Sequence, residues 1–108
     1  MKKTRKNLLA AIKHTILSVN KTGKVILYGS QARGTANKKS DWDILILLDK
    51  PKIEPEDFDL ITYPLIELGW NEGEHISPKL YTVAEWQKRI FTPFYKNIEN
   101  EGIVITNK

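Results

Sequence analysis

The sequence predicts an α/β fold of the α+β kind, with a small mixed β-sheet flanked by helices. Segments in which apolar residues recur at helical spacing alternate with short apolar runs that are typical of buried strands. The length agrees with this fold class, because 108 residues are enough for one hydrophobic core and too few for two. We therefore expect residues 1–108 to form a single domain.

Composition excludes several classes of protein. Cysteine is absent, which excludes a disulfide framework and a thiolate metal site. No apolar run approaches ~20 residues, which excludes a membrane-spanning helix, and Lys13 and His14 interrupt the apolar run after the basic N-terminus, unlike a signal peptide. We expect a cytoplasmic protein without a membrane partner. The net charge of +4 suits an anionic substrate or a nucleic acid, although dispersed lysines on a solvated surface explain it more simply.

The first half of the sequence predicts a helix followed by two strands. We expect the helix at residues 4–20 and its end at Gly23, since glycine favours helix termination. Residues 24–28 predict a buried strand, and residues 42–48 predict a second strand that is covered on both faces. Between the strands, residues 29–40 are expected to form a loop with one short helical turn. The buried side of the helix is expected to carry Leu8, Leu9, Ile12, Ile16 and Val19.

The second half predicts another helix and a third strand. Pro55, followed by two acidic residues, opens the helix, and Pro64 is expected to kink it. After a turn at residues 71–74, residues 75–81 alternate polar and apolar side chains, as a half-exposed strand does. The buried side of this helix is expected to carry Phe58, Ile61, Leu65 and Leu68.

Two short helices and an edge strand are expected near the C-terminus. Thr82 and Glu85 form the capping box of the first of these helices, which we expect Pro93 to end. A helical stretch follows at residues 94–101, and residues 103–105 predict the edge strand. One face of the capped helix is expected to carry Val83, Trp86 and Ile90.

The strand at residues 24–28 ends in Gly29-Ser30, a position that suits a bound phosphate. Glycine lets the backbone turn sharply and lets a ligand approach the main chain closely. If residues 30–34 begin a helical turn, its unpaired N–H groups point outward and make an anion site for the phosphates of a nucleotide. The Ser30 hydroxyl can donate to a phosphate oxygen, and Arg33 can bind the same oxygens with two parallel hydrogen bonds.

Asp41 and Asp43 predict a metal site at the start of the second strand. Residues two apart on a strand point to the same face, and two carboxylates there repel each other unless a cation lies between them. Mg²⁺ suits this pair, because proteins bind it through one or two carboxylates together with substrate phosphates. Trp42, between the two, is expected to point to the opposite face and to pack beneath a helix.

The residues of these two sites follow one another in the order Gly29-Ser30-x-x-x-Gly34 and then Ser40-Asp41-Trp42-Asp43. This pattern resembles the signature of the DNA polymerase β-like nucleotidyltransferase superfamily, and especially its minimal nucleotidyltransferases. The resemblance implies the nucleotidyltransferase fold, Mg²⁺ as the cofactor, and two sets of functional residues. The nucleotide-binding set is Gly29, Ser30, Arg33, Gly34 and Ser40, and the metal-binding set is Asp41 and Asp43.

The resemblance also implies an activity. Members of the superfamily transfer a nucleoside monophosphate from a nucleoside triphosphate, here expected to be ATP, to a hydroxyl group. The chain is too short for the second domain that usually holds the acceptor, so the acceptor is expected on another macromolecule. Minimal nucleotidyltransferases are often partnered with a helical HEPN-type protein, in pairs that resemble toxin and antitoxin, and we expect such a partner here. The C-terminal edge strand also leaves a homodimer open.

One departure from the superfamily pattern concerns a third carboxylate, which the superfamily usually carries on a later strand. Residues 75–81 contain none. Glu74 is the expected substitute and would complete the catalytic set with the two aspartates, although a solvated turn residue is the alternative. Lys79 would place a positive charge near the position of a second metal, and His75 is a candidate group on the acceptor side. The departure keeps a second hypothesis open, in which a catalytically degenerate member acts by binding a nucleotide or a protein.

Overall fold

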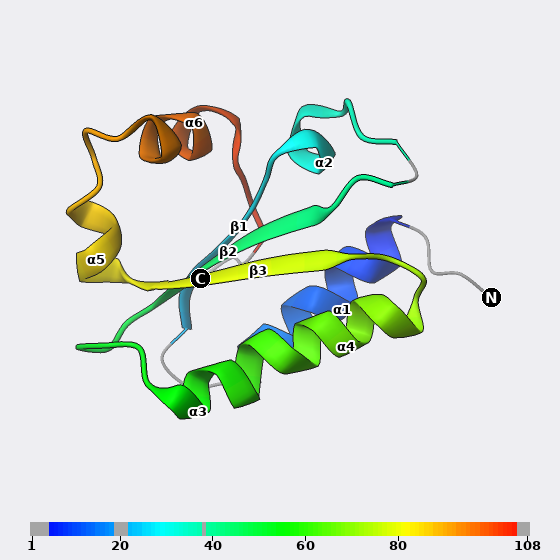
Figure 1. The fold of residues 1–108 in the computed structure, drawn as a ribbon, viewed down its shortest axis with the longest axis horizontal. Coiled ribbons are helices and arrows are strands. Elements are labelled where there is room, and N and C mark those ends of the chain that lie inside the picture. Colours follow the sequence, from blue (N-terminus) through cyan, green and yellow to red (C-terminus); the bar gives the residue numbers. More distant parts are fainter. Residues whose placement is uncertain (1–4, 19–21, 38, 106–108) are drawn as a thin grey trace.

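The computed structural model describes residues 5–18, 22–37 and 39–105. At its centre is a mixed sheet of four strands in the order β3-β2-β1-β4 (Figure 1). β1 (Thr22–Tyr28) pairs antiparallel with β2 (Trp42–Leu48) and with β4 (Ile103–Val104), whereas β3 (Ile76–Thr82) runs parallel to β2. The predicted mixed sheet is therefore confirmed, with the predicted C-terminal strand at one of its edges.

Helices cover both faces of the sheet (Figure 1). One face packs against α1 (Arg5–Leu17) and a long helical segment made of α3 (Pro55–Asp57), η1 (Phe58–Thr62) and α4 (Tyr63–Asn71). The other face packs against α5 (Val83–Gln87) and α6 (Pro93–Glu101). The short helix α2 (Ser30–Arg33) directly follows β1. Within the described part of the chain, every helix is too short or too polar to cross a membrane.

Strand β2 lies between the two halves of the core. Trp42, Ile44 and Ile46 belong to the cluster beneath α1 and α4. Leu45 and Leu47 belong to the cluster beneath α5 and α6. The prediction of a strand covered on both faces is confirmed, because every residue of β2 is buried except the partly exposed Asp43.

The first helix and the first strand differ from the prediction at their boundary. Gly23 does not end a helix but lies inside β1, at an irregularity of the ladder with β2. A Cβ atom at Gly23 would lie 3.2 Å from the carbonyl oxygen of Leu47, so glycine serves this close approach of two backbones. Of the predicted helix, α1 confirms the central part, whereas Thr4, Val19 and Asn20 lie outside the described residues.

The second helix contains a π-helical segment that corrects the predicted buried face. The amide of Tyr63 bonds to the carbonyl of Phe58 in a wider turn immediately before Pro64. Proline has no amide to donate, so a wider turn at this point accommodates it. Ile61 is buried as expected, but Phe58 is 41% exposed. The inward position beside it is taken by Asp57, whose carboxylate accepts hydrogen bonds from the Lys50 ammonium and the backbone amide of residue 54.

The helices near the C-terminus also differ in their limits. The capping box at Thr82 and Glu85 is confirmed, and each side chain accepts a bond from the other residue's amide. The helix nevertheless ends at Gln87, so of the predicted apolar face only Trp86 is buried, and Val83 and Ile90 are exposed. Pro93 does not end this helix but opens α6, where a missing amide is tolerated.

Candidate functional site

The predicted site lies where the end of β1 meets the start of β2, beside α2 (Figure 1). β1 ends at Tyr28, and its partner across the antiparallel ladder is Asp43. Residues directly opposite each other on neighbouring strands share a face, so Asp43 lies on the face that α5 and α6 cover. Asp41 is near enough for its charge to act on Asp43. The fold therefore brings the two aspartates together beside the glycine turn.

The contact between Gly29 and Asp43 explains the glycine of the Gly-Ser pair. Gly29 has a left-handed backbone with φ of 76°, a conformation that side chains with a Cβ atom rarely adopt. A Cβ atom there would also collide with the Oδ2 atom of Asp43. Glycine thus permits the turn and leaves room for the carboxylate at the same time.

Helix α2 forms the turn that the sequence predicted after the glycine. The amides of Ala32 and Arg33 donate to the Gly29 carbonyl at 3.0 Å, and the amide of Gly34 donates to the Ser30 carbonyl at 3.0 Å. Gly34 ends the helix in a left-handed conformation, with φ of 80°. The first amides of a helix have no partner within the helix, and at α2 these belong to the residues that directly follow Gly29, a position that suits a bound anion.

The two aspartates differ in their surroundings. Asp41 is exposed, and its Oδ1 atom lies 2.7 Å from Nδ1 of His75. Asp43 is partly buried, and its pKa is raised, first by burial and then by the negative charge of Asp41. The positive charges of Lys79, Arg33 and His75 oppose this rise. The Asp43 carboxyl is therefore ionised less readily than a solvated one despite these cations.

This pair suits a metal ion that is shared with a substrate. Mg²⁺ takes one or two carboxylates and completes its shell with water and phosphate oxygens, and a cation would relieve the repulsion between Asp41 and Asp43. Among the described residues, no group of three or more His, Cys, Asp or Glu side chains is placed to hold a metal. The donor set thus fits an ion held jointly by two carboxylates and a nucleotide, rather than a cage made by protein alone.

Glu74 does not join the two aspartates. Its Oε1 atom accepts a hydrogen bond of 3.0 Å from Nε1 of Trp42. Trp42 is buried beneath α1 and α4, as the sequence predicted, and this is the face opposite Asp43. The structure therefore separates Glu74 from the catalytic set in which the sequence placed it, because the indole holds its carboxylate behind the sheet.

The position beside Asp43 on β3 belongs to Ser77. These two residues are partners in the parallel ladder between β2 and β3. Lys79 follows two positions later and so faces the same side, where its charge lowers the pKa of Asp43. The side chains that β3 places near Asp43 are thus the hydroxyl of Ser77 and the ammonium group of Lys79, where the superfamily pattern predicts a third carboxylate.

Two further residues of the predicted nucleotide-binding set have partners within the chain. Arg33 Nη1 lies 3.1 Å from Oε1 of Glu101, at the end of α6. Ser40 Oγ accepts a hydrogen bond of 2.9 Å from the amide of Asn37 and its own amide bonds back to Asn37. Glu101 therefore competes with a phosphate for the Arg33 guanidinium, and Ser40 shapes the loop between α2 and β2.

The structure adds residues that sequence reasoning missed. Arg5, in the first turn of α1, contacts both Gln31 of α2 and the ring of Trp42. Arg5 and Gln31 are 26 positions apart, so no periodicity could reveal this contact. Tyr28, the last residue of the predicted buried strand, has a buried hydroxyl for which the described residues offer no hydrogen-bond partner. Burial, followed by the charge of Asp43, raises the pKa of this phenol.

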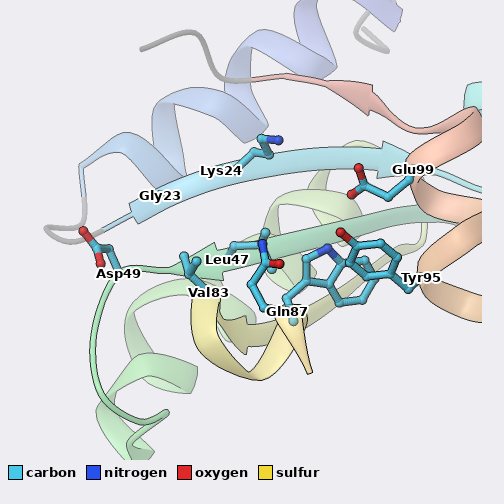
Figure 2. Close-up of a pocket in the computed structure, with 9 residues that line it drawn as sticks. Gly23, Lys24, Leu47, Asp49, Val83, Gln87, Tyr95 and Glu99 are labelled. Carbon is cyan, nitrogen blue, oxygen red and sulfur yellow. The ribbon is translucent and has the colours of Figure 1, made fainter. Parts of the chain in front are cut away.

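A cavity of about 400 Å³ opens at the other end of β1 and β2 (Figure 2). Gly23 and Lys24 at the start of β1 and Leu47 near the end of β2 line it. Tyr95 and Glu99 of α6 close its other side. β1 and β2 run between this cavity and the aspartates, so the cavity is separate from the predicted phosphate and metal sites.

Comparison of sequences connects this geometry with known proteins. A family described as nucleotidyltransferase domain matches residues 9–105. A putative protein adenylyltransferase of Methanocaldococcus jannaschii is 34% identical to the chain over 82 residues, which make up 76% of each protein. The matched region contains the glycine turn and both aspartates.

Solved structures with a similar fold include proteins of toxin–antitoxin systems. A chain from a toxin–antitoxin complex with AMP-PNP gives a TM-score of 0.64 at 15% identity and covers 97% of this chain and 75% of its own. A chain from a variant of the toxin–antitoxin MntA-HpeT gives a TM-score of 0.63 at 17% identity and covers 98% of this chain and 75% of its own. A protein from Shewanella oneidensis gives a TM-score of 0.59 at 12% identity and covers 97% of this chain and 74% of its own. At these identities the likeness concerns the fold.

Proposed function

The chain belongs to the nucleotidyltransferase domain family, and from this premise we propose that it transfers the AMP group of ATP to a hydroxyl of a partner protein, with Mg²⁺ as its cofactor. The observation that carries the proposal is the contact of Gly29 with Asp43, which joins the phosphate turn to the pair of aspartates. The name of the 34% identical relative, a putative protein adenylyltransferase, supports AMP as the transferred group and a protein as the acceptor.

In the proposed reaction, the acceptor oxygen forms a bond to the α-phosphorus of ATP. The bond from that phosphorus to the oxygen bridging the α- and β-phosphates breaks, pyrophosphate leaves, and the proton of the acceptor hydroxyl passes to solvent. Ser30 and the first amides of α2 hold phosphate oxygens, while Asp41 and Asp43 hold Mg²⁺. When bound, the ion neutralises triphosphate charge and stabilises the entering and leaving oxygens. His75 holds the Asp41 carboxylate through its bond of 2.7 Å.

We expect the partner to be a helical HEPN-type protein, in a pair like toxin and antitoxin. Two of the structural neighbours come from toxin–antitoxin complexes, one of them with a nucleotide analogue, which supports a nucleotide and a protein partner. The surface of α4 also suits protein contact. Tyr63 is 59% exposed and Trp70 is 71% exposed, and large exposed apolar side chains of this kind are common at protein interfaces.

A second candidate is a binding module that retains the fold without turnover. The observation that favours it is the pairing of Asp43 with Ser77 on β3. An acceptor hydroxyl is normally activated by a general base, such as a carboxylate, or by a metal ion, and Ser77 offers neither a carboxylate nor a ligand charge for a second metal. Under this alternative the chain binds ATP and its partner but forms no covalent product.

One experiment separates these functions. The protein is incubated with ATP labelled at the α-phosphate, Mg²⁺ and the product of the neighbouring gene, and labelled protein is followed on a denaturing gel. We expect label on the partner, no label with Asp43→Asn, and less label with GTP, CTP or UTP. Thermal unfolding with ATP and Mg²⁺ runs in parallel. Stabilisation without label transfer would favour the binding module, and the absence of both effects would contradict nucleotide binding altogether.

A further inference from the structure

The two proposed metal ligands flank a side chain that lies on the other side of the sheet. Trp42 stands between Asp41 and Asp43 and is 5% exposed. It packs in the cluster beneath α1 and α4. Because Asp41 directly precedes β2 and Trp42 and Asp43 are its first two residues, a rotation or slip of Trp42 would move both carboxylates. The placement of this indole is therefore tied to the placement of the metal ligands.

Two contacts from separate elements hold the indole. Its Nε1 atom donates to Oε1 of Glu74 at 3.0 Å. Glu74 directly precedes His75, and β3 begins at the next residue. The guanidinium carbon of Arg5 lies 5.2 Å from the centre of the ring, a distance at which a cation is attracted to an aromatic face. The strand that carries the aspartates is thus held from α1 and from the turn that precedes β3.

Arg5 also holds the phosphate turn. Its Nη1 atom donates to Oε1 of Gln31 at 3.0 Å, and its Nη2 atom donates to the carbonyl oxygen of the same residue at 2.7 Å. Gln31 is 7% exposed, so both of these acceptors need a partner from within the protein. Gln31 directly follows Ser30, and a movement of α2 would move the proposed phosphate ligands.

We propose that Arg5 is a positioning residue, which fixes the phosphate turn relative to the two aspartates by bonding to Gln31 and stacking on Trp42. This inference rests on the proposed function, because it takes Ser30 and the aspartates as the groups that bind ATP and Mg²⁺. A planar guanidinium is suited to the task, since its fork can bond both Gln31 acceptors while its face lies on the ring. An ammonium group at this position has the charge but lacks the fork.

Substitution of Arg5 tests the inference, with binding of ATP in the presence of Mg²⁺ measured by calorimetry. We expect Arg5→Met to weaken binding by about tenfold, the lower end of the losses seen when a supporting residue behind a metal site is removed. Arg5→Lys should restore binding only in part. Arg89→Met is the matched control, because Arg89 stacks 4.5 Å from the Tyr81 ring and donates to a backbone carbonyl away from the turn; it should bind ATP as the wild type does.

Amide hydrogen exchange provides a readout that does not depend on the nucleotide. Exchange across residues 29–34 should be faster in Arg5→Met than in the wild type and unchanged in Arg89→Met. Wild-type affinity and exchange in Arg5→Met would overturn the inference, as would an equal loss of affinity in Arg89→Met. If Arg5→Met does not fold, Gln31→Met removes one of the two acceptors and should shift both readouts in the same direction.

The two proposals fail differently in this experiment. Failure of the wild-type protein to bind ATP would overturn the proposed function, while exchange across residues 29–34 would still decide whether Arg5 holds the turn. Normal binding by the wild type together with normal binding and exchange in Arg5→Met and Gln31→Met would overturn the positioning role alone.

Discussion

Replacing Gly29 with alanine is the most direct test of how the site is built. The new methyl group would meet two obstacles. The backbone φ of 76° is left-handed, and the position of the Cβ atom is occupied by Oδ2 of Asp43. We therefore expect Gly29→Ala to lower the free energy of unfolding and also to displace a proposed metal ligand.

Gly73 provides a reference for the cost of a positive φ alone. It has nearly the same backbone angle, with φ of 71°, but a Cβ atom there would have no neighbour within 4 Å. Gly73→Ala should therefore cost only the left-handed conformation, about 1–2 kcal/mol. Gly29 also has a ψ of −159°, and this combination with a positive φ is almost restricted to glycine and costs other residues about 1–3 kcal/mol. Gly29→Ala must in addition push the Asp43 side chain from its rotamer, at about 0.5–1.5 kcal/mol, so we expect a total loss of about 1.5–4.5 kcal/mol. Each kcal/mol lowers Tm by about 4–8 °C in a domain of this size.

The assay combines denaturant unfolding with calorimetric titration of ATP in the presence and absence of Mg²⁺. Both variants should unfold at lower denaturant concentration than the wild type. Only Gly29→Ala should lose Mg²⁺-dependent affinity for ATP, by tenfold or more, which corresponds to about 1.4 kcal/mol or more of binding free energy.

The comparison can refute the reasoning in two ways. Equal destabilisation of the two variants would show that the Asp43 carboxylate moves aside without cost, so the close contact does not constrain it. Unchanged Mg²⁺-dependent binding in Gly29→Ala would show that this carboxylate position is not the one that holds the metal. Either result would remove the observation on which the proposed function mainly rests.

Three further predictions concern the charges of the site. Burial and the charge of Asp41 raise the pKa of Asp43, so the stability of the fold should fall as pH rises from about 4, the ordinary carboxyl pKa, through the raised value. Without metal, Asp43→Asn should therefore raise Tm more at pH 7 than at pH 3. An equal rise of Tm at the two pH values would contradict this prediction. Glu101→Gln should free the guanidinium of Arg33 and tighten ATP binding, whereas Arg33→Gln should weaken ATP binding, and calorimetric titration measures both affinities. Unchanged ATP affinity in both variants would exclude a contact between Arg33 and the phosphates. Ser77→Asp should add a carboxylate beside Asp43 and tighten Mn²⁺ binding about tenfold, or about 1.4 kcal/mol, whereas Ser77→Asn should not.

Much of the fold could be predicted because local patterns and tertiary packing agree. The apolar run of β2 is buried on both faces, and the capping box at Thr82 starts a helix at the expected residue. The predictions that failed are those in which packing decides against local pattern. Gly23 looked like a helix end but lies where two backbones approach closely. Phe58 fits the helical spacing, but the wider turn before Pro64 leaves it exposed.

The site could be predicted only where its residues are close in sequence. The glycine turn and the Asp-Trp-Asp segment are separated by one loop, and their residue types limit the chemistry strongly. Arg5 and Gln31 could not be found in this way, because their contact depends on how α1 packs against the sheet. Glu74 was assigned from its position before β3, but the side to which its carboxylate turns is set by Trp42, a residue 32 positions away.

The hydrogen bond between Glu74 and Trp42 bears on the choice between an enzyme and a binding module. Glu74 is the acidic residue nearest to β3 in the sequence, and its hydrogen bond to Trp42 draws it away from the aspartates. The same bond helps to hold the strand that carries them. Glu74, which bonds to Trp42 on the face opposite Asp43, is not placed to share a metal with the two aspartates among the described residues. The residue beside Asp43 on β3 is Ser77, so no carboxylate at that position would activate an acceptor. Under the proposed function, activation of the acceptor hydroxyl therefore falls to ATP-bound Mg²⁺ or to the partner. If the partner supplies that group, Ser77→Asp should leave the rate of label transfer to the partner unchanged. Faster transfer by Ser77→Asp would instead show that the carboxylate missing from β3 limits the reaction.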